Sequence, residues 1–149
     1  MMKGERVEVK SNQMYDLKKI VASSVKDEQR DLGAFASIDK ETASIMVWNY
    51  HDGNIISPEK EVVINLSGIP NQNVKLTHYR IDNEYSNSYE VWKKIGSPQN
   101  PTKQQIETLE KAGQLKTINE PENFKVANGK LALTIRMPSQ GVSLLKLDW

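Results

Sequence analysis

Short strand-like segments separated by turn-forming residues recur along most of the chain, and they limit its fold more than any other feature. In Glu5–Lys10, for example, apolar and polar side chains alternate, which is typical of a strand with one covered face. The strongest turn signal is Asn128-Gly129, because these residues readily adopt the left-handed backbone of a two-residue hairpin. About eight such strands, with turns roughly every 8–12 residues, predict a mainly β fold, an antiparallel β-sandwich. The expected strands are 5–10, 34–38, 43–51, 61–67, 73–81, 123–127, 130–137 and 142–149.

The strand expected at 43–51 has apolar side chains on both of its faces. Ile45 and Val47 share one face, while Trp48 and Tyr50 share the other. This pattern is typical of a central strand that is covered on each side. We therefore expect Trp48 and Tyr50 to pack in the core.

A helical segment interrupts the run of strands at 84–116. Asn87 and Glu90 form a capping-box pattern at the start of one helix, and Thr102 begins a second such pattern. Apolar residues within 14–25 recur at near-helical spacing and indicate one further short helix. The predicted organisation is a sandwich domain formed by 1–83 and 117–149, with 84–116 as a two-helix insertion.

Three aromatic residues, Tyr85, Tyr89 and Trp92, lie at positions i, i+4 and i+7 of the first helix and share one face of it. One interpretation is that they pack the helix onto the sandwich. The other is that they form an interface with another domain or subunit, with Arg80 and Glu84 supplying polar contacts at its rim. Aromatic residues suit interfaces because they bury a large area and keep one polar atom.

The composition excludes several classes of function. A net charge of +1 argues against nucleic-acid binding. The sequence contains no run of about 18 apolar residues, so it predicts no membrane-spanning helix. The chain has no cysteine, which excludes disulfides and thiolate metal sites. That absence is expected of a reducing compartment, so a cytoplasmic location is favoured.

No catalytic constellation is recognisable in the sequence. His51 beside Asp52, and His78 near the end of a strand, each lack a second histidine or a cysteine at metal-ligand spacing, so structural hydrogen bonding is favoured. Glu84 and Glu90 lie six residues apart beside the start of a helix, where Glu90 is better explained as a capping residue. We predict no catalytic residue, no cofactor site and no metal site.

The stretch that contains the aromatic stripe is similar to the segment that follows the catalytic barrel in the β-xylosidases of glycoside hydrolase family 39. The likeness extends to both ends of the chain. The phrases that carry it are His78-Tyr-Arg-Ile-Asp82, Ser86-Asn-Ser-Tyr-Glu-Val-Trp92 and Gly96-Ser-Pro-Gln99, with further likeness at 4–9, 47–52 and 141–147.

The resemblance implies that this chain is the C-terminal part of a retaining β-xylosidase of xylan degradation, without its catalytic part. The two catalytic glutamates of the family lie on a (β/α)₈ barrel, which takes about 250 residues and has no matching positions here. The chain would then be a non-catalytic accessory domain that is inactive alone. Its expected partners are the catalytic barrel of the same polypeptide and other subunits of a homo-oligomer, and xylo-oligosaccharides would be met only through the parent.

An alternative is a stand-alone carbohydrate-binding module. Sandwiches of this kind stack exposed aromatic rings on sugars, and Trp48, Tyr50 and Trp149 are the candidates. A third class is an unrelated interaction domain. The sugar preferred by the parent and the oligomeric state stay open at this point.

Overall fold

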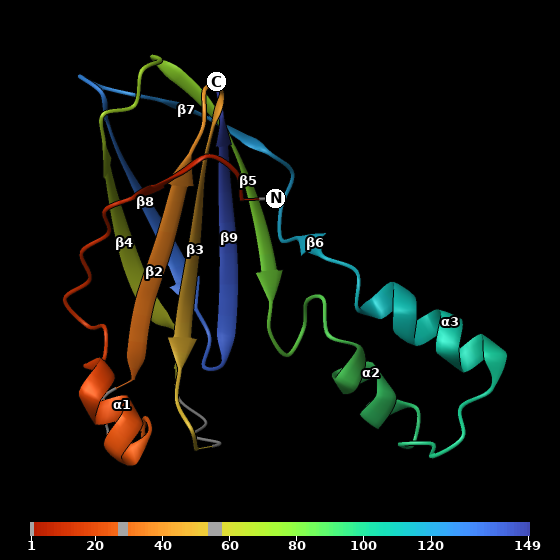
Figure 1. The fold of residues 1–149 in the computed structure, drawn as a ribbon. Coiled ribbons are helices and arrows are strands. Elements are labelled where there is room, and N and C mark those ends of the chain that lie inside the picture. The colour runs from red at the N-terminus through yellow and green to blue at the C-terminus, as the bar shows by residue number, and fades with distance from the viewer. Residues whose placement is uncertain (1, 27–29, 54–57) are drawn as a thin grey trace.

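Two antiparallel sheets face each other in the computed structural model, which describes residues 2–26, 30–53 and 58–149 (Figure 1). Within these residues there are nine strands and three helices, so the predicted antiparallel sandwich with helices in 84–116 is confirmed. The strands are β1 (Glu5–Val7), β2 (Asp31–Ile38), β3 (Thr42–Tyr50), β4 (Lys60–Ser67), β5 (Asn73–Ile81), β6 (Lys116–Thr117), β7 (Glu122–Lys125), β8 (Lys130–Met137) and β9 (Gly141–Asp148). The helices are α1 (Leu17–Ser23), α2 (Ser88–Lys94) and α3 (Lys103–Ala112).

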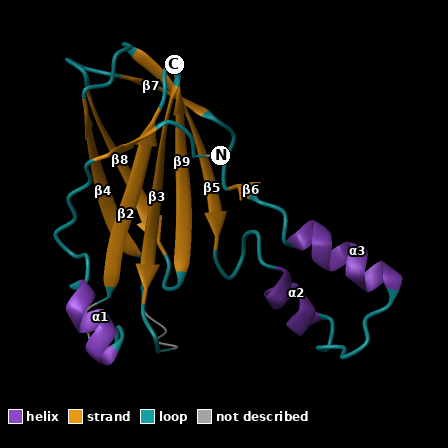
Figure 2. Cartoon of the chain, in the orientation of Figure 1, coloured by secondary structure: helices purple, strands orange, loops and turns teal. Residues whose placement is uncertain are grey.

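The two sheets differ greatly in size. The larger sheet has seven strands in the order β1-β2-β3-β9-β5-β6, and β7 also pairs with β5. The smaller sheet contains only β4 and β8, which pair antiparallel along their whole length. The smaller sheet covers one face of the larger sheet, and no layer formed by the described residues covers the opposite face (Figure 2).

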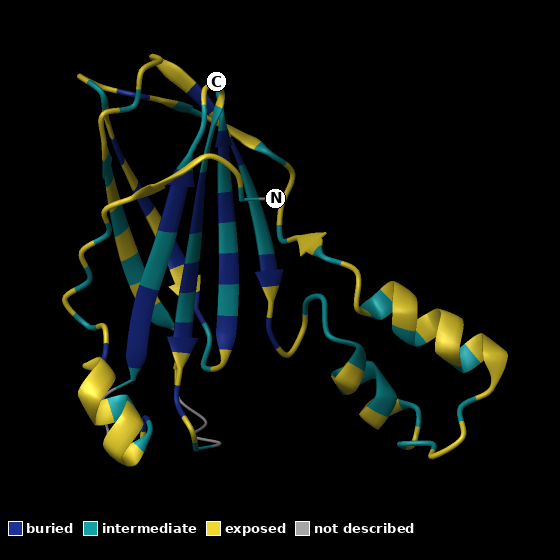
Figure 3. Ribbon diagram, viewed as in Figure 1, coloured by how far each residue is buried: buried dark blue, intermediate teal, exposed yellow. Residues whose placement is uncertain are grey.

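Apolar side chains from both sheets meet in the space between them. On β8, Leu131, Leu133 and Ile135 all point inward, as their alternation predicts, and each is less than 9% exposed. Asn128 and Gly129 both have positive φ and connect β7 to β8 as the predicted tight turn. The buried strand segments are dark in Figure 3. The other buried residues of this core are Leu32, Ala36, Ile45, Val47, Val74, Leu76, Val126, Met137, Leu145 and Leu147.

The helices α2 and α3 lie beside the sandwich and cover neither sheet (Figures 1 and 2). The capping box at Thr102 is complete, because its side chain and that of Gln105 each accept a hydrogen bond from the other's backbone N–H. Asn87 caps α2 by accepting from the N–H of Glu90. The carboxylate of Glu90 instead pairs with Lys93 at 2.7 Å.

The helix α1 falls within the predicted range 14–25. Asp16 caps it, with one carboxylate oxygen accepting from two backbone N–H groups of the first turn. Two of its apolar residues, Leu17 and Val21, are 72% and 81% exposed. The apolar residues that anchor this segment flank the helix instead, since Tyr15 and Val25 are buried.

The strand β3 is central, as predicted, because β2 and β9 pair with its two sides. Its inner face is buried, with Ile45 and Val47 at 4% and 2% exposure. The expectation that both faces are covered is wrong. Trp48 is only partly buried and Tyr50 is 44% exposed, because the smaller sheet lies on one side only.

Candidate functional site

The uncovered side of the larger sheet carries a continuous group of apolar side chains. The strand registers place cross-strand neighbours of β2, β3, β9 and β5 in rows, and two adjacent rows are apolar. One row is Phe35, Met46, Leu144 and Tyr79, and the next is Gly33, Trp48, Val142 and Ile81. We call this surface the outer apolar face and define it as Phe35, Met46, Trp48, Tyr50, Tyr79, Ile81, Val142 and Leu144.

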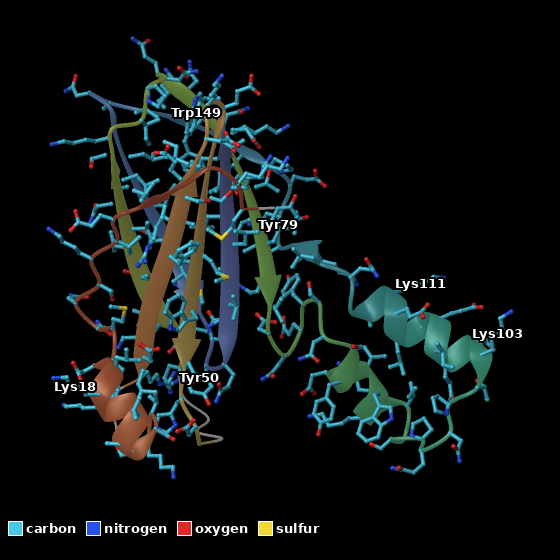
Figure 4. All side chains as sticks on the ribbon, in the orientation of Figure 1. Lys18, Tyr50, Tyr79, Lys103, Lys111 and Trp149 are labelled. Carbon is cyan, nitrogen blue, oxygen red and sulfur yellow. The ribbon has the colours of Figure 1, made fainter. Side chains whose placement is uncertain are left out.

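The outer apolar face has a sharp polar boundary. The next row along the strands consists of Ser37, Ser44, Lys146 and Thr77. Ile81 and Tyr50 are the members most exposed to water, at 46% and 44%. Figure 4 labels Tyr50 and Tyr79 on two different strands of this sheet.

The outer side of the smaller sheet is different in character. On β4, Val63 is the single outward apolar side chain, between Glu61, Asn65 and Ser67. On β8, the outward positions include Thr134 and Arg136. A solvated antiparallel sheet face is typically polar, as this one is, whereas an apolar face is typical of contact with another layer.

Trp48 is held in place by a buried carboxylate. Its Nε1–H donates to Asp31 Oδ2 at 2.8 Å, and Asp31 Oδ1 accepts from the backbone N–H of Tyr15 at 2.8 Å. The hydroxyl of Tyr50 donates to Asp52 at 2.5 Å, which lowers the pKa of the Asp52 carboxyl and raises that of the phenol. The prediction that Trp48 and Tyr50 pack in the core is therefore wrong.

Trp149, the third candidate for sugar stacking, lies elsewhere. It sits at the opposite end of the sandwich from Tyr50, as the labels in Figure 4 show. Its Nε1–H donates to the carbonyl of Lys40 at 3.2 Å, and its ring packs against the core. The three candidate aromatic residues thus do not form one stacking platform.

Of the three aromatic residues predicted to share one face of a helix, only Tyr89 and Trp92 lie on α2, because Tyr85 precedes its N-cap Asn87. The rings of Tyr89 and Trp92 are stacked, with centroids 5.6 Å apart and planes at 22°. Trp92 Nε1–H donates to the carbonyl of Pro98 at 3.0 Å, and the ammonium of Lys93 lies 5.0 Å from the centre of the Tyr89 ring. Tyr89 is 61% exposed, whereas Tyr85 is partly buried beside the Asp82 turn.

Arg80 does not lie with this stripe. Its side chain points between the two sheets and is 7% exposed. One guanidinium nitrogen donates to Ser143 Oγ at 3.2 Å and another to the carbonyl of Arg136 at 2.6 Å. The structure therefore places Arg80 inside the sandwich, away from the rim predicted for it. Glu84 is exposed at the start of the helical segment.

The two histidines make structural hydrogen bonds. His78 Nε2 lies 2.8 Å from Ser143 Oγ, and burial together with the nearby Arg80 lowers the pKa of His78 from 6.5 to about 4. Ser143 is 0% exposed, so this pair presents no nucleophile to solvent. His51 is buried, and its Nδ1 accepts from the N–H of Gly53 at 2.8 Å.

Two further kinds of site are absent from the part of the chain that the structure describes, a cluster of metal ligands and a membrane-spanning helix. No group there of three or more His, Cys, Asp or Glu side chains could hold a metal ion. None of the helices described is long and apolar enough to cross a bilayer.

Several solved structures share this fold. A family 39 enzyme from Xanthomonas axonopodis pv. citri is 16% identical with a TM-score of 0.65, and the match covers 77% of this chain and 25% of that one. A monomeric β-xylosidase from Caulobacter crescentus CB15 is 20% identical with a TM-score of 0.59, over 77% of this chain and 26% of that one. A bacterial orthologue of human α-L-iduronidase is 18% identical with a TM-score of 0.58, and the match covers 80% of this chain and 22% of that one. The chain thus spans about a quarter of the length of the structures it matches.

The family itself is identified at the level of sequence. No curated protein matches the chain. The family model described as glycosyl hydrolases family 39, however, matches residues 9–131, which is most of the chain. This range includes the phrases of residues 78–99 on which the resemblance was based. The resemblance predicted from the sequence is therefore confirmed, and the chain belongs to glycosyl hydrolases family 39.

Proposed function

We propose that this chain is the non-catalytic C-terminal accessory domain of a family 39 enzyme of the β-xylosidase type. The observation that carries the proposal is its share of the matched structures, which is 22–26% of each chain. The remaining three quarters would hold the catalytic (β/α)₈ barrel, which takes about 250 residues. In this reading xylo-oligosaccharides are bound and cleaved by the parent enzyme.

The architecture supports a non-catalytic role. A retaining glycosidase needs two carboxyl groups about 5–5.5 Å apart on either side of the scissile bond. Two carboxylates of the stretch 78–99, those of Asp82 and Glu90, are already engaged in local structure. Asp82 accepts from the N–H groups of Glu84 and Tyr85 at 2.7 and 2.9 Å, and Glu90 pairs with Lys93.

The role we assign to the domain is mechanical. It covers part of the barrel and so keeps apolar surface away from water. The helical segment, which projects beside the sandwich, is suited to a contact between subunits of a homo-oligomer. Tyr89 and Trp92 present a stacked aromatic pair there, with Glu84 exposed at the start of the segment.

A second candidate is a carbohydrate-binding module, and the position of Trp48 and Tyr50 on an uncovered sheet face favours it. Aromatic rings on such a face can stack on pyranose rings. Sugar sites also need polar groups that orient hydroxyls. The Tyr50 hydroxyl is already bonded to Asp52, and the cross-strand neighbours of Trp48 are Gly33 and Val142. We therefore rank this candidate second.

One experiment tests the proposed function. The reading frame that encodes this chain is sequenced on both sides, and the intact parent and the 149-residue chain are assayed with p-nitrophenyl xyloside. We expect an encoded barrel, turnover by the parent and none by the chain. Turnover by the chain alone, lost when one of its own glutamates is changed to glutamine, would overturn the proposal. So would a reading frame without a barrel.

A further inference from the structure

We propose that the outer apolar face is the surface on which the catalytic barrel of the same polypeptide docks. This inference rests on the proposed function and adds the surface through which it is carried out. It replaces the helical stripe of Tyr89 and Trp92 as the barrel contact and leaves that stripe for subunit contacts.

The size and shape of the face suit a rigid neighbour. Its two apolar rows each cross four strands, so each is about 15 Å long at the usual strand spacing. The side chains come from four hydrogen-bonded strands, β2, β3, β9 and β5, whose backbones hold them in fixed register. Such a surface is flat and offers little conformational freedom to lose on binding.

The chemistry of the face favours a layer of helices as its occupant. Apolar sheet faces in domains are covered by another sheet or by helices. The outside of a (β/α)₈ barrel is a ring of helices, so it can supply that layer. The matched structures hold about three quarters of their length outside the part that corresponds to this chain, which leaves room for the barrel.

The contrast between the two outer faces of the sandwich supports the same conclusion. If both were solvated in the parent, both should be polar. The face of the smaller sheet is polar apart from Val63 and the small Ala132, whereas the face of the larger sheet is apolar over two full rows. A contiguous apolar surface on one side of an otherwise polar domain marks an interaction site.

The end of the sandwich that carries Tyr50 has more apolar surface nearby. Leu17 and Val21 of α1 are 72% and 81% exposed, and α1 lies at this end, as the labels of Lys18 and Tyr50 show in Figure 4. These residues add exposed apolar surface at the same end of the domain as Tyr50.

Hydroxyl-radical footprinting of the isolated chain and of the intact parent tests the inference directly. Trp48, Tyr50, Tyr79 and Met46 should react at least about fivefold more slowly in the parent, because a covered side chain loses contact with water. Trp149, at the opposite end of the sandwich from Tyr50, serves as the internal comparison, because neither the outer apolar face nor the proposed subunit contact includes it.

A pair of substitutions in the intact parent gives a second readout. Ile81→Lys places a charge on the outer apolar face at a position that is already 46% exposed, so the sandwich itself should tolerate it. Val63→Lys is the matched control on the outer face of the smaller sheet, where Val63 is 56% exposed. In thermal unfolding of the parent, we expect Ile81→Lys to give two transitions, one for this domain and one for the barrel. We expect Val63→Lys to leave a single transition.

The outcomes distinguish this inference from the proposed function. A parent without a barrel overturns both. The docking surface alone is overturned if the parent has a barrel but the four residues react as fast as in the isolated chain and both variants show the same unfolding transitions. The inference is also overturned if the face is covered by a second copy, seen as a dimer of the isolated chain that Ile81→Lys abolishes without any protection in the parent. Xylo-oligosaccharide protection of Trp48 and Tyr50 in the parent would assign the face to sugar and overturn it as well.

Discussion

The indole ring of Trp48 on β3 lies across Gly33 on β2. The two residues are cross-strand partners in the larger sheet. A β-carbon at position 33 would lie 2.3 Å from Cζ2 of the indole, which is far inside van der Waals contact. The ring also donates its Nε1–H to Asp31, two residues away on the same strand as Gly33. The absence of a side chain at Gly33 is therefore what allows the ring to lie against the sheet.

The first prediction concerns this contact. Gly33→Ala should lower the free energy of unfolding by about 1–3 kcal/mol, because the added methyl displaces the indole and strains its hydrogen bond to Asp31. Urea unfolding measures the change. In a Trp48→Ala background the same substitution should cost much less, because the three atoms nearest to the added methyl all belong to the Trp48 ring. An equal cost in both backgrounds would show that the ring is not the cause.

The second prediction concerns Asn49, which links the two sheets. Its side chain is 1% exposed, and Nδ2–H donates to the carbonyls of Met137 and Pro138 at 3.2 and 3.0 Å. Asn49→Ala should lower the free energy of unfolding by about 1–3 kcal/mol, because one buried and one partly buried carbonyl lose their donor. Asn65→Ala, at an exposed outward position of β4, should change it by less than about 0.5 kcal/mol. Similar losses for both variants in urea unfolding would contradict this role.

The third prediction is a pH dependence of stability. The pKa of His78 is lowered from 6.5 to about 4 by burial and by Arg80. Between these values the unfolded chain binds a proton that the folded chain does not, so the free energy of unfolding falls as the pH falls through this window. The expected loss is about 1–2 kcal/mol, less than the full pKa difference implies because solvent partly screens the ring.

The measurement for His78 is urea unfolding at pH 7 and at pH 4.5, for the wild type and for His78→Gln. The variant should lose less stability than the wild type between the two pH values. Asp39 and Asp52 have lowered carboxyl pKa values, so their contributions are lost only as the pH falls through and below about 4. If His78→Gln loses as much stability as the wild type between the two pH values, His78 is not the source of the pH dependence.

The fourth prediction separates the helical segment from the sandwich. Because Tyr89 is 61% exposed and stacks only within the helical segment, Tyr89→Ala should leave the unfolding midpoint of the isolated chain nearly unchanged. In the intact parent the same change should weaken subunit association, as measured by light scattering across a dilution series. Phe at this position keeps the ring and should preserve association. A parent that associates equally well with Ala at position 89 would argue against the proposed subunit contact.

Local structure was readable from the residues wherever one physical signal dominated. The alternation of Leu131, Leu133 and Ile135, the Asn128-Gly129 turn and the caps at Asn87 and Thr102 all occur as predicted. Each depends on side chains within a few positions of one another, so no knowledge of distant segments is required. The family resemblance came from the same kind of contiguous phrases, around residues 78–99.

The positions of Trp48 and Arg80 could not be read in this way. A strand that is apolar on both sides does not reveal which side meets the second sheet, and Arg80 looked like a surface residue because it is charged. Its burial depends on Ser143 and the carbonyl of Arg136, which are more than fifty positions away in the sequence.

The sequence by itself determined that this chain is built from antiparallel strands with a helical segment, and which family it belongs to. Those properties follow from short-range periodicity, turn chemistry and contiguous motifs. Only the tertiary structure decided on which side of the larger sheet the second sheet packs, and thus which side is left bare. The physical reason is that pairing and packing between segments far apart in the sequence decide which face of a sheet is covered.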